Sequence, residues 1–244
     1  MKFNTNSTVY IITYSVVMVV LVAVLLSLAA IGLKPRQEAN ILNEKKSQIV
    51  KALGYDATTS YEDVVAEAAL LNAEGVVAEN DTQKVFDALQ DVKATREGGL
   101  FPIFEAKDGS VVVPLYGAGL WGPIWGYVAL GADMNTVQGI VLDHQGETPG
   151  LGAEITTAKH QAMYVGKQVF EGEELVGITL KKGGADKDNI HEVDAITGGT
   201  KTSDGVSNMI KDCLASYKPY FVANKAEVVA EEKSNDKNTE NNGK

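Results

Sequence analysis

The sequence predicts an α+β protein in which a single N-terminal transmembrane helix precedes a domain with a mostly antiparallel sheet and flanking helices. Three observations support this class. Residues 9–33 form an uncharged apolar run, several stretches with helical periodicity follow, and short β-branched runs begin at residue 110. Helices that are segregated from a series of strands are typical of α+β domains.

The apolar run VYIITYSVVMVVLVAVLLSLAAIGL, at residues 9–33, is long enough to cross a bilayer as a helix. A cleaved signal peptide is the alternative, because Ser27 and Ala29 have the small-x-small spacing of a cleavage site. However, the run exceeds the roughly 7–15 apolar residues of a signal core, and only Lys2 marks a basic end. The pattern therefore favours one uncleaved anchor in membrane lipid, after a short flank at residues 1–8.

The remainder divides by composition into a helical membrane-proximal part at 34–95, an α+β domain at 96–224 and a charged, Asn-rich tail at 225–244 that we expect to be disordered. Expected helices cover 36–53, 61–72 (with Ser60 as N-cap), 81–92, 153–168 and 204–217, the last of which Pro219 ends. Expected strands cover 110–115, 125–130, 137–143, 175–181 and 190–196.

Charge and composition exclude several classes of function. The formal net charge is -10, and no basic stripe is present that could follow a nucleic-acid backbone. The chain has one cysteine, Cys213, and three histidines, without the spacing of a zinc, iron–sulfur or haem site. We therefore expect no metal site, and any redox chemistry would need an organic cofactor or a metal shared with a partner.

The most informative segment is DAITGGTKTSDGV at residues 194–206. A strand pattern ends there, two glycines allow a tight turn, and a hydroxyl-rich run opens a helix. Glycines let a backbone approach a ligand closely, and a helix N-terminus favours an anion, so the segment suits a phosphate. An ordinary strand–turn–helix connection with a capping threonine is the alternative. The spacings of a Walker phosphate loop and of a dinucleotide fingerprint are both missing.

Three motifs carry a family resemblance. Residues 194–200 resemble the flavinylation motif D-x-x-[ST]-G-A-T, with Gly199 in place of the alanine; residues 146–152 contain E-T-P-G-L-G; and residues 115–122 resemble Y-G-x-G-L-W. In this order, behind one anchor, they resemble the flavin-carrying subunits of the sodium-translocating NADH:quinone oxidoreductase and the related Rnf complexes. The match is nearer to the C subunit of the quinone oxidoreductase than to the Rnf G subunit.

The resemblance implies that a flavin transferase attaches FMN covalently, through its phosphate, to Thr200. Asp194 matches another fixed position of the motif. No residue of the chain is expected to be catalytic. The other cofactor-binding candidates are Thr197, Gly198, Gly199, Lys201 and Thr202 near the phosphate, Glu147, Thr148, Gly150 and Leu151 near the flavin ring, and Trp121 as an aromatic shield, with a core position as the alternative for Trp121.

The resemblance further implies an electron-transferring subunit of a multi-subunit membrane complex that carries electrons from NADH to quinone and exports sodium. This chain is not expected to bind NADH itself. The family places the soluble domain on the periplasmic side of the bacterial inner membrane. Lys34 and Arg36, directly after the apolar run, favour the cytoplasmic side instead. The Rnf G subunit and a cofactor-free anchored scaffold are the alternative functions.

Overall fold

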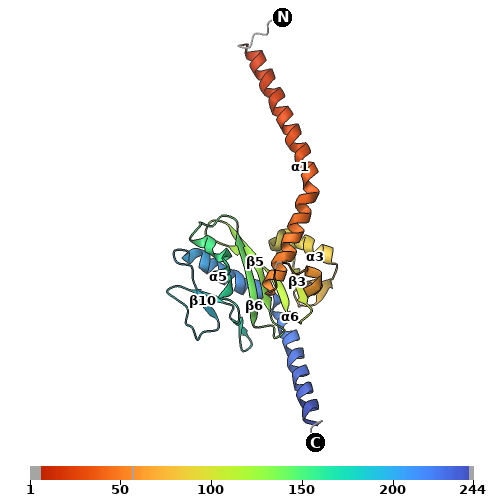
Figure 1. Cartoon of the computed structure of the whole chain (residues 1–244), viewed down its shortest axis with the longest axis vertical. Helices are drawn as coiled ribbons and strands as arrows, with labels where there is room; N and C mark the ends of the chain where they lie inside the picture. Colours follow the sequence, from red (N-terminus) through yellow and green to blue (C-terminus); the bar gives the residue numbers. More distant parts are fainter. Residues whose placement is uncertain (1–6, 57, 242–244) are drawn as a thin grey trace. The chain divides into compact units, whose positions relative to one another are not determined.

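The computed structural model describes residues 7–56 and 58–241, with residues 226–241 described by their backbone only. Contacts between Cα atoms divide the chain into two units, with the boundary between Lys45 and Lys46. This boundary differs from the expected ones at residues 33 and 95. Figure 1 shows the elements in chain order.

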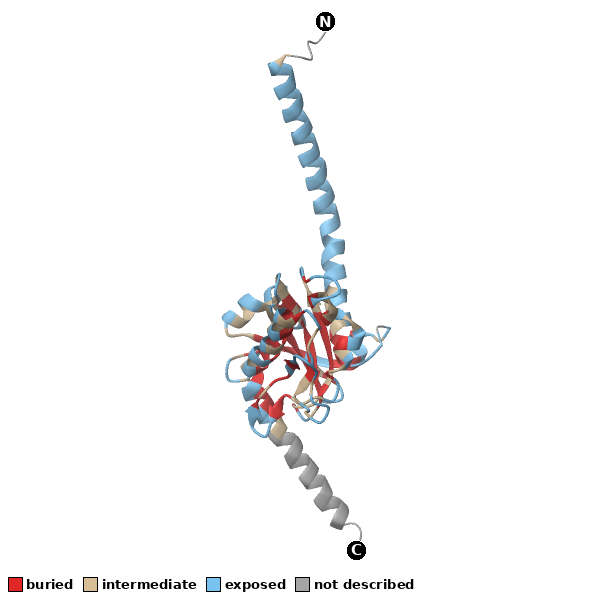
Figure 2. Cartoon of the chain, turned by 90° about the vertical axis from the view of Figure 1, so that its left-hand side faces the viewer, coloured by how far each residue is buried: buried red, intermediate tan, exposed pale blue. Residues whose placement is uncertain are grey.

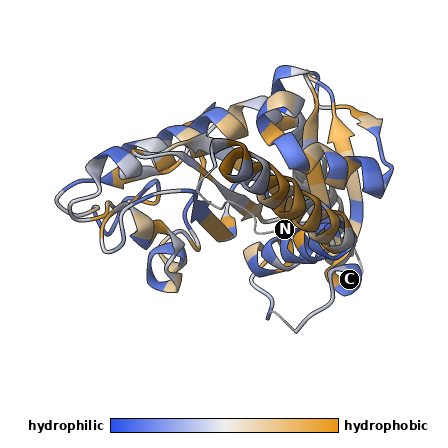
Figure 3. Ribbon diagram, turned by 90° about the horizontal axis from the view of Figure 1, so that it is seen from above, coloured by the Kyte–Doolittle hydropathy of each residue, from blue (hydrophilic) through white to orange (hydrophobic). Residues whose placement is uncertain are grey.

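Helix α1 (Thr8–Ala52) is continuous through Pro35, where the sequence predicts separate helices on either side. A proline inside a helix removes one hydrogen bond and tends to kink it, yet it need not end it. Its apolar part has a mean hydropathy of 3.0, and α1 is the only helix of the described residues that is long and apolar enough to span a membrane. The residues of this part are coloured as exposed in Figure 2 and mostly as hydrophobic in Figure 3. After Ala52, Gly54 takes a φ of 84°, as is common where helices end.

The second unit is built on a six-stranded sheet in the order β2-β1-β3-β4-β5-β6, whose neighbours all pair antiparallel. The predicted strands of its second half are confirmed. They are β4 (Val111–Ala118), β5 (Pro123–Leu130) and β6 (Val137–His144). Val111 lies opposite Leu130 and Ala118 opposite Pro123, so β4 and β5 form a hairpin whose tip is residues 119–122.

The first half of the sheet corrects the sequence prediction. The helix expected at 61–72 stops after one turn, α2 (Tyr61–Val64), and continues as β1 (Val65–Leu71), which pairs with β2 (Val77–Glu79) and β3 (Phe101–Ala106). The Ala- and Leu-rich β1 has helical propensity, but pairing with two neighbours and burial between them outweigh it. Ser60 makes no side-chain cap, since its hydroxyl donates to Glu62 at 2.6 Å.

Short elements replace other long ones that the sequence predicts. The helix expected at 81–92 is divided into α3 (Thr82–Ala88), η1 (Leu89–Asp91) and α4 (Val92–Glu97). The helix expected at 153–168 is reduced to η2 (Gly152–Thr156) and α5 (Ala158–Ala162). The remaining strands are β7 (Phe170–Glu171), which pairs with β8 (Glu174–Leu175), and β9 (Thr179–Lys181), which runs parallel to β10 (Glu192–Asp194).

Helix α6 (Thr200–Asn241) begins earlier and ends later than predicted, and it passes through Pro219. The prediction that Pro219 ends the helix is therefore wrong. The backbone is helical up to Asn241, so α6 includes most of the segment at 225–244 that is predicted to be a tail. Residues 242–244 lie outside the described part. One face of α6 joins the core (Figure 2), and its buried apolar members are Val206, Met209, Ile210, Cys213, Leu214, Tyr217, Tyr220 and Phe221.

Two glycines let α6 approach the end of β4 closely. A Cβ on Gly205 would stand 2.3 Å from the backbone oxygen of Ala118, and a Cβ on Gly117 would stand 2.7 Å from Cβ of Met209. A larger residue at either position would push the helix away from the strand. The start of α6 is therefore held against the hairpin tip at 119–122.

We expect Gly205→Ala to destabilise the domain. Alanine in a helix is favoured over glycine by about 1 kcal/mol, but its Cβ would meet a backbone oxygen that cannot move aside, and overpacking costs typically about 1–3 kcal/mol. Urea unfolding, followed by tryptophan fluorescence, measures the difference. Gly146→Ala is the control, since its Cβ would have an ordinary 3.9 Å contact. Equal stability of the two variants would contradict the close approach.

A second prediction concerns acid stability. His160 is buried, with Nε2 3.0 Å from the Tyr164 hydroxyl, and burial lowers its pKa to about 4 from 6.5. The unfolded chain therefore binds a proton more readily, so the stability that neutral His160 contributes is complete above pH 6.5 and is lost as the pH falls toward 4. We expect wild type to lose up to about 3 kcal/mol of unfolding free energy over this range through His160 alone.

The measurement is urea unfolding at about pH 7 and about pH 4.5, which bracket most of this loss, with His160→Gln beside the wild type. The variant lacks the titrating group, so its stability should fall less between the two pH values. The same loss in both proteins would show that another group is responsible.

Candidate functional site

The three motif segments meet at one corner of the domain. They are the hairpin tip at 119–122, the loop at 146–152 that follows β6, and the segment at 195–203, which contains the connection from β10 to α6 and the first turn of α6. A single side chain, Glu147, bonds to the other two segments. Its Oε1 accepts the Trp121 N–H at 3.0 Å, and its Oε2 accepts the Thr202 hydroxyl at 2.6 Å. We call these three residues the Glu147 network.

Glu147 is a buried carboxylate that stays charged. Only 5% of it is exposed. Burial raises its pKa, but hydrogen bonds from Thr202 and from the Trp121 and Leu120 N–H groups outweigh this and hold the pKa below its usual value. Hydrogen bonds to an ionised acceptor are stronger than neutral ones. The network therefore joins the three segments by charge-assisted bonds.

Glycines surround this carboxylate because nothing larger fits. A Cβ on Gly119 would stand 2.3 Å from Oε1, and a Cβ on Gly152 would stand 2.2 Å from Oε2 and 2.5 Å from the Thr202 hydroxyl. Each oxygen is thus covered by a glycine. Contact with the carboxylate oxygens therefore explains why positions 119 and 152 of the two motifs are glycine.

Thr200 is the first residue of α6 and is half-buried. The turn before it is held by Ser203, whose hydroxyl accepts the Ile196 N–H at 3.0 Å and whose own N–H donates to the Gly199 carbonyl at 2.9 Å. Gly198 has a φ of 78°, a conformation that favours glycine. The Thr200 hydroxyl is therefore carried by a long helix at its N-terminal end, where a negative group is favoured.

Gly199 stands where the flavinylation motif has alanine, and packing explains the smaller residue. A Cβ at Gly199 would be 2.9 Å from Cγ2 and 3.1 Å from Cβ of Ile196. The β-branched Ile196 thus occupies the space that an alanine methyl would take. The departure from the motif leaves the backbone turn in place.

Large apolar side chains are exposed around this corner. Trp121 is 67% exposed, Leu120 52% and Leu151 41%. Leu151 lies against Gly198, whose Cβ would be 2.7 Å from its Cδ2. Trp121 is therefore not a core residue, which was the alternative for this side chain. An exposed apolar surface of this kind beside a helix N-terminus suits a ligand with a flat ring and a phosphate.

The structure separates the predicted site residues into two groups. Glu147 and Thr202 are buried with their polar atoms bonded to one another, and Gly199 is buried in the turn. The exposed candidates are Trp121, Thr148, Gly150, Leu151, Thr197, Gly198 and Lys201, with Thr200 half-buried between the groups. Sequence reasoning did not identify Leu120, and the link between Glu147 and Thr202 gave no signal because 55 positions separate them.

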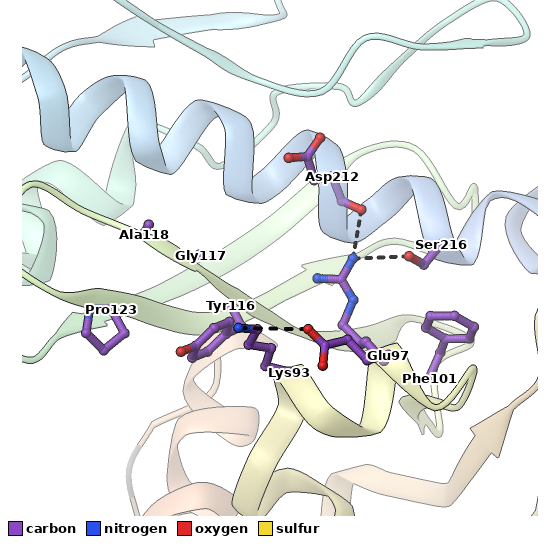
Figure 4. Close-up of a pocket in the computed structure, with 10 residues that line it drawn as sticks. Lys93, Glu97, Phe101, Tyr116, Gly117, Ala118, Pro123, Asp212 and Ser216 are labelled. Atoms are coloured by element: carbon purple, nitrogen blue, oxygen red, sulfur yellow. Dashed lines mark hydrogen bonds and ion pairs between the residues drawn. The ribbon is translucent and has the colours of Figure 1, made fainter.

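A groove of about 630 Å³ lies farther along α6, between α4 and the C-terminal end of β4 (Figure 4). Three of the charged side chains that line it bond within the protein. Lys93 pairs with Glu97 at 3.8 Å, and Arg96 donates to the Ser216 hydroxyl at 3.1 Å and to Sγ of Cys213 at 2.9 Å. None of the predicted site residues lines this groove, and the Arg96 bonds attach α4 to α6. Among the described residues, no cluster of His, Cys, Asp or Glu could hold a metal ion.

Comparison with known proteins identifies relatives of this chain. A family model described as an FMN-binding domain matches residues 119–215, a range that includes the hairpin tip, the Glu147 loop and Thr200. A solved structure of the C subunit of the Na(+)-translocating NADH-quinone reductase from Parabacteroides distasonis superposes with a TM-score of 0.70 at 36% identity, covering 78% of this chain and 96% of that one.

Two curated relatives are the same subunit of this enzyme in other organisms. The C subunit of the Na(+)-translocating NADH-quinone reductase from Vibrio anguillarum is 33% identical over 209 residues, which cover 76% of this chain and 82% of the relative. The C subunit from Haemophilus ducreyi is 32% identical over 251 residues, which cover 92% and 97%. The chain therefore belongs to the family of C subunits of the Na(+)-translocating NADH-quinone reductases.

Proposed function

We propose that this chain is the electron-transferring flavoprotein subunit of a membrane NADH:quinone reductase that exports sodium, and that it carries FMN as a phosphoester on Thr200. The observation that carries the proposal is the convergence of the three motif segments, through Glu147, on the corner where Thr200 begins α6. The family's FMN-binding domain covers the same residues. The relatives are C subunits of the quinone reductase, which favours this complex over the Rnf alternative.

Attachment requires only a hydroxyl and an activated FMN, for example a flavin dinucleotide supplied by a flavin transferase. The Thr200 oxygen forms a bond to the FMN phosphorus and loses its proton, while the phosphoanhydride bond breaks and a nucleoside monophosphate leaves. The ester keeps a negative phosphate beside the N-terminus of α6, which stabilises it. The exposed residues Thr197, Gly198 and Lys201 are close to Thr200 in the chain and are candidates to contact that phosphate.

The flavin ring would rest on the exposed apolar surface. Leu151 and Trp121 offer side chains for its faces, and the backbone at Thr148 and Gly150 is exposed and able to bond its polar edge. Bound FMN supplies the redox chemistry, and the protein supplies placement. Because the surface is open, a flavin held there can approach the redox group of another subunit, as an electron carrier requires. The chain has no dinucleotide fingerprint with which to bind NADH.

The apolar part of α1 is proposed to anchor the subunit in a bacterial inner membrane. Helix α1 has 45 residues, and its apolar stretch has a mean hydropathy of 3.0 with no buried residue. We propose that the second unit lies on the periplasmic side, as the family resemblance implies. Lys34 and Arg36 oppose this orientation, but charge bias orients a long translocated domain only weakly.

The attachment site has a direct test. Coexpressed with a flavin transferase, the wild-type chain should give a fluorescent flavin band after denaturing electrophoresis, and Thr200→Ala should give none. Thr82→Ala is the matched control, because this exposed threonine is also the first residue of a helix, α3, but lies outside the three motifs, and its band should remain. A dark wild-type band would favour a cofactor-free scaffold, and a fluorescent Thr200→Ala band would place the ester on another residue.

The orientation is tested by labelling an introduced cysteine in intact cells. Lys187→Cys places a thiol at an exposed position, whereas the native Cys213 is fully buried and should not react. A membrane-impermeant maleimide should label the variant once the outer membrane is permeabilised, and should leave the wild type unlabelled. Labelling that appears only after the inner membrane is lysed would place the domain in the cytoplasm.

A further inference from the structure

We propose that Glu147 is a positioning residue for flavin attachment. Its carboxylate fixes the first turn of α6 to the hairpin tip, so that the Thr200 hydroxyl is already oriented when the activated flavin arrives. This inference rests on the proposed function, since it concerns how the same threonine becomes modified.

The buried position of the carboxylate argues against direct contact with a ligand. Glu147 is 5% exposed, and its two oxygens already accept the Trp121 N–H and the Thr202 hydroxyl. Gly119 and Gly152 cover these oxygens so closely that not even a methyl group fits between. An atom of a bound flavin therefore has no path to Glu147, and the residue can act only through its neighbours.

The neighbour that matters is Thr202. It stands two positions after Thr200 in the first turn of α6 and is 1% exposed, so its hydroxyl is committed to Glu147. On the other side, Trp121 belongs to the exposed apolar surface that would receive the ring. One carboxylate thus sets the position of the ester-forming threonine relative to the surface on which the flavin would rest.

The charge makes this arrangement hard to open. A buried carboxylate that loses its donors remains charged and unpaired, which is far more costly than losing a neutral hydrogen bond. The corner should therefore be ordered in the protein without flavin. Reaction of an oriented hydroxyl is faster than reaction of a mobile one, because small misplacements of reacting atoms cost large factors in rate.

The experiment measures the rate of flavin attachment to the unmodified full-length chain by a purified flavin transferase with a flavin dinucleotide. Thr202→Val removes the donor at nearly constant volume, and Glu147→Gln removes the charge. We expect each single variant to slow attachment at least about tenfold. The double variant should attach flavin no more slowly than the slower of the two single variants, because both substitutions remove the same hydrogen bond between Glu147 and Thr202. Thr202→Ser, which keeps the hydroxyl, should stay within about twofold of wild type.

Glu154→Gln is the matched control, because it removes the charge of a half-buried glutamate seven positions after Glu147. Its rate of flavin attachment should equal that of wild type. Amide hydrogen exchange of the unmodified proteins distinguishes positioning from general destabilisation. In Thr202→Val, exchange should increase at residues 119–122 and 199–203 and stay unchanged in β1 and β3.

Three results would overturn the proposal, and they are distinguishable. Attachment to Thr202→Val and Glu147→Gln at the wild-type rate would leave Thr200 as the site but remove the role of Glu147. Slow attachment accompanied by faster exchange throughout the sheet would mean that the residues act only on global stability. No attachment to the wild type would remove the proposed function and this inference together.

Discussion

The candidate site depends on the charged, buried carboxylate of Glu147. A charge with so little solvent contact needs donors from the protein, and here they come from two segments remote in sequence, the hairpin tip with Trp121 and the start of α6 with Thr202. Satisfying the charge therefore brings three segments into one arrangement. The glycines around the carboxylate, Gly119 and Gly152, are a consequence, because each must leave room for an oxygen.

Helix α6 connects this corner to the core. Its first residue is Thr200, and its buried face packs with the sheet as far as Phe221. Close contact between Gly205 and Ala118 aligns the helix with the end of β4. A site carried by the terminus of a packed helix is placed more accurately than one on a free loop. Because α6 is packed against the core, its first residue, Thr200, is held in a fixed position.

An open corner of this kind, with Thr200 as the proposed attachment point and an exposed apolar surface, suits a carrier. A flavin performs electron transfer by its own chemistry, so the protein needs to hold it, leave it accessible and keep it in the right membrane. In the proposed function, the exposed Trp121 and Leu151 would leave the flavin accessible, and the apolar part of α1 would hold the subunit in the membrane. Burial in α1 begins only near its end, at Ile49, Val50 and Ala52, which belong to the second unit.

The sequence alone determined the features that local patterns encode. These are the apolar anchor, the strands β4, β5 and β6, and the motifs around Thr200, because hydropathy, alternation and turn residues act over a few positions. The tertiary structure decided that β1 is a strand, since the residues with which it pairs in β3 lie 30 to 41 positions away, and that Pro219 does not end α6. It alone joined Glu147 to Thr202, because burial selects partners by proximity in space and not by order in the chain.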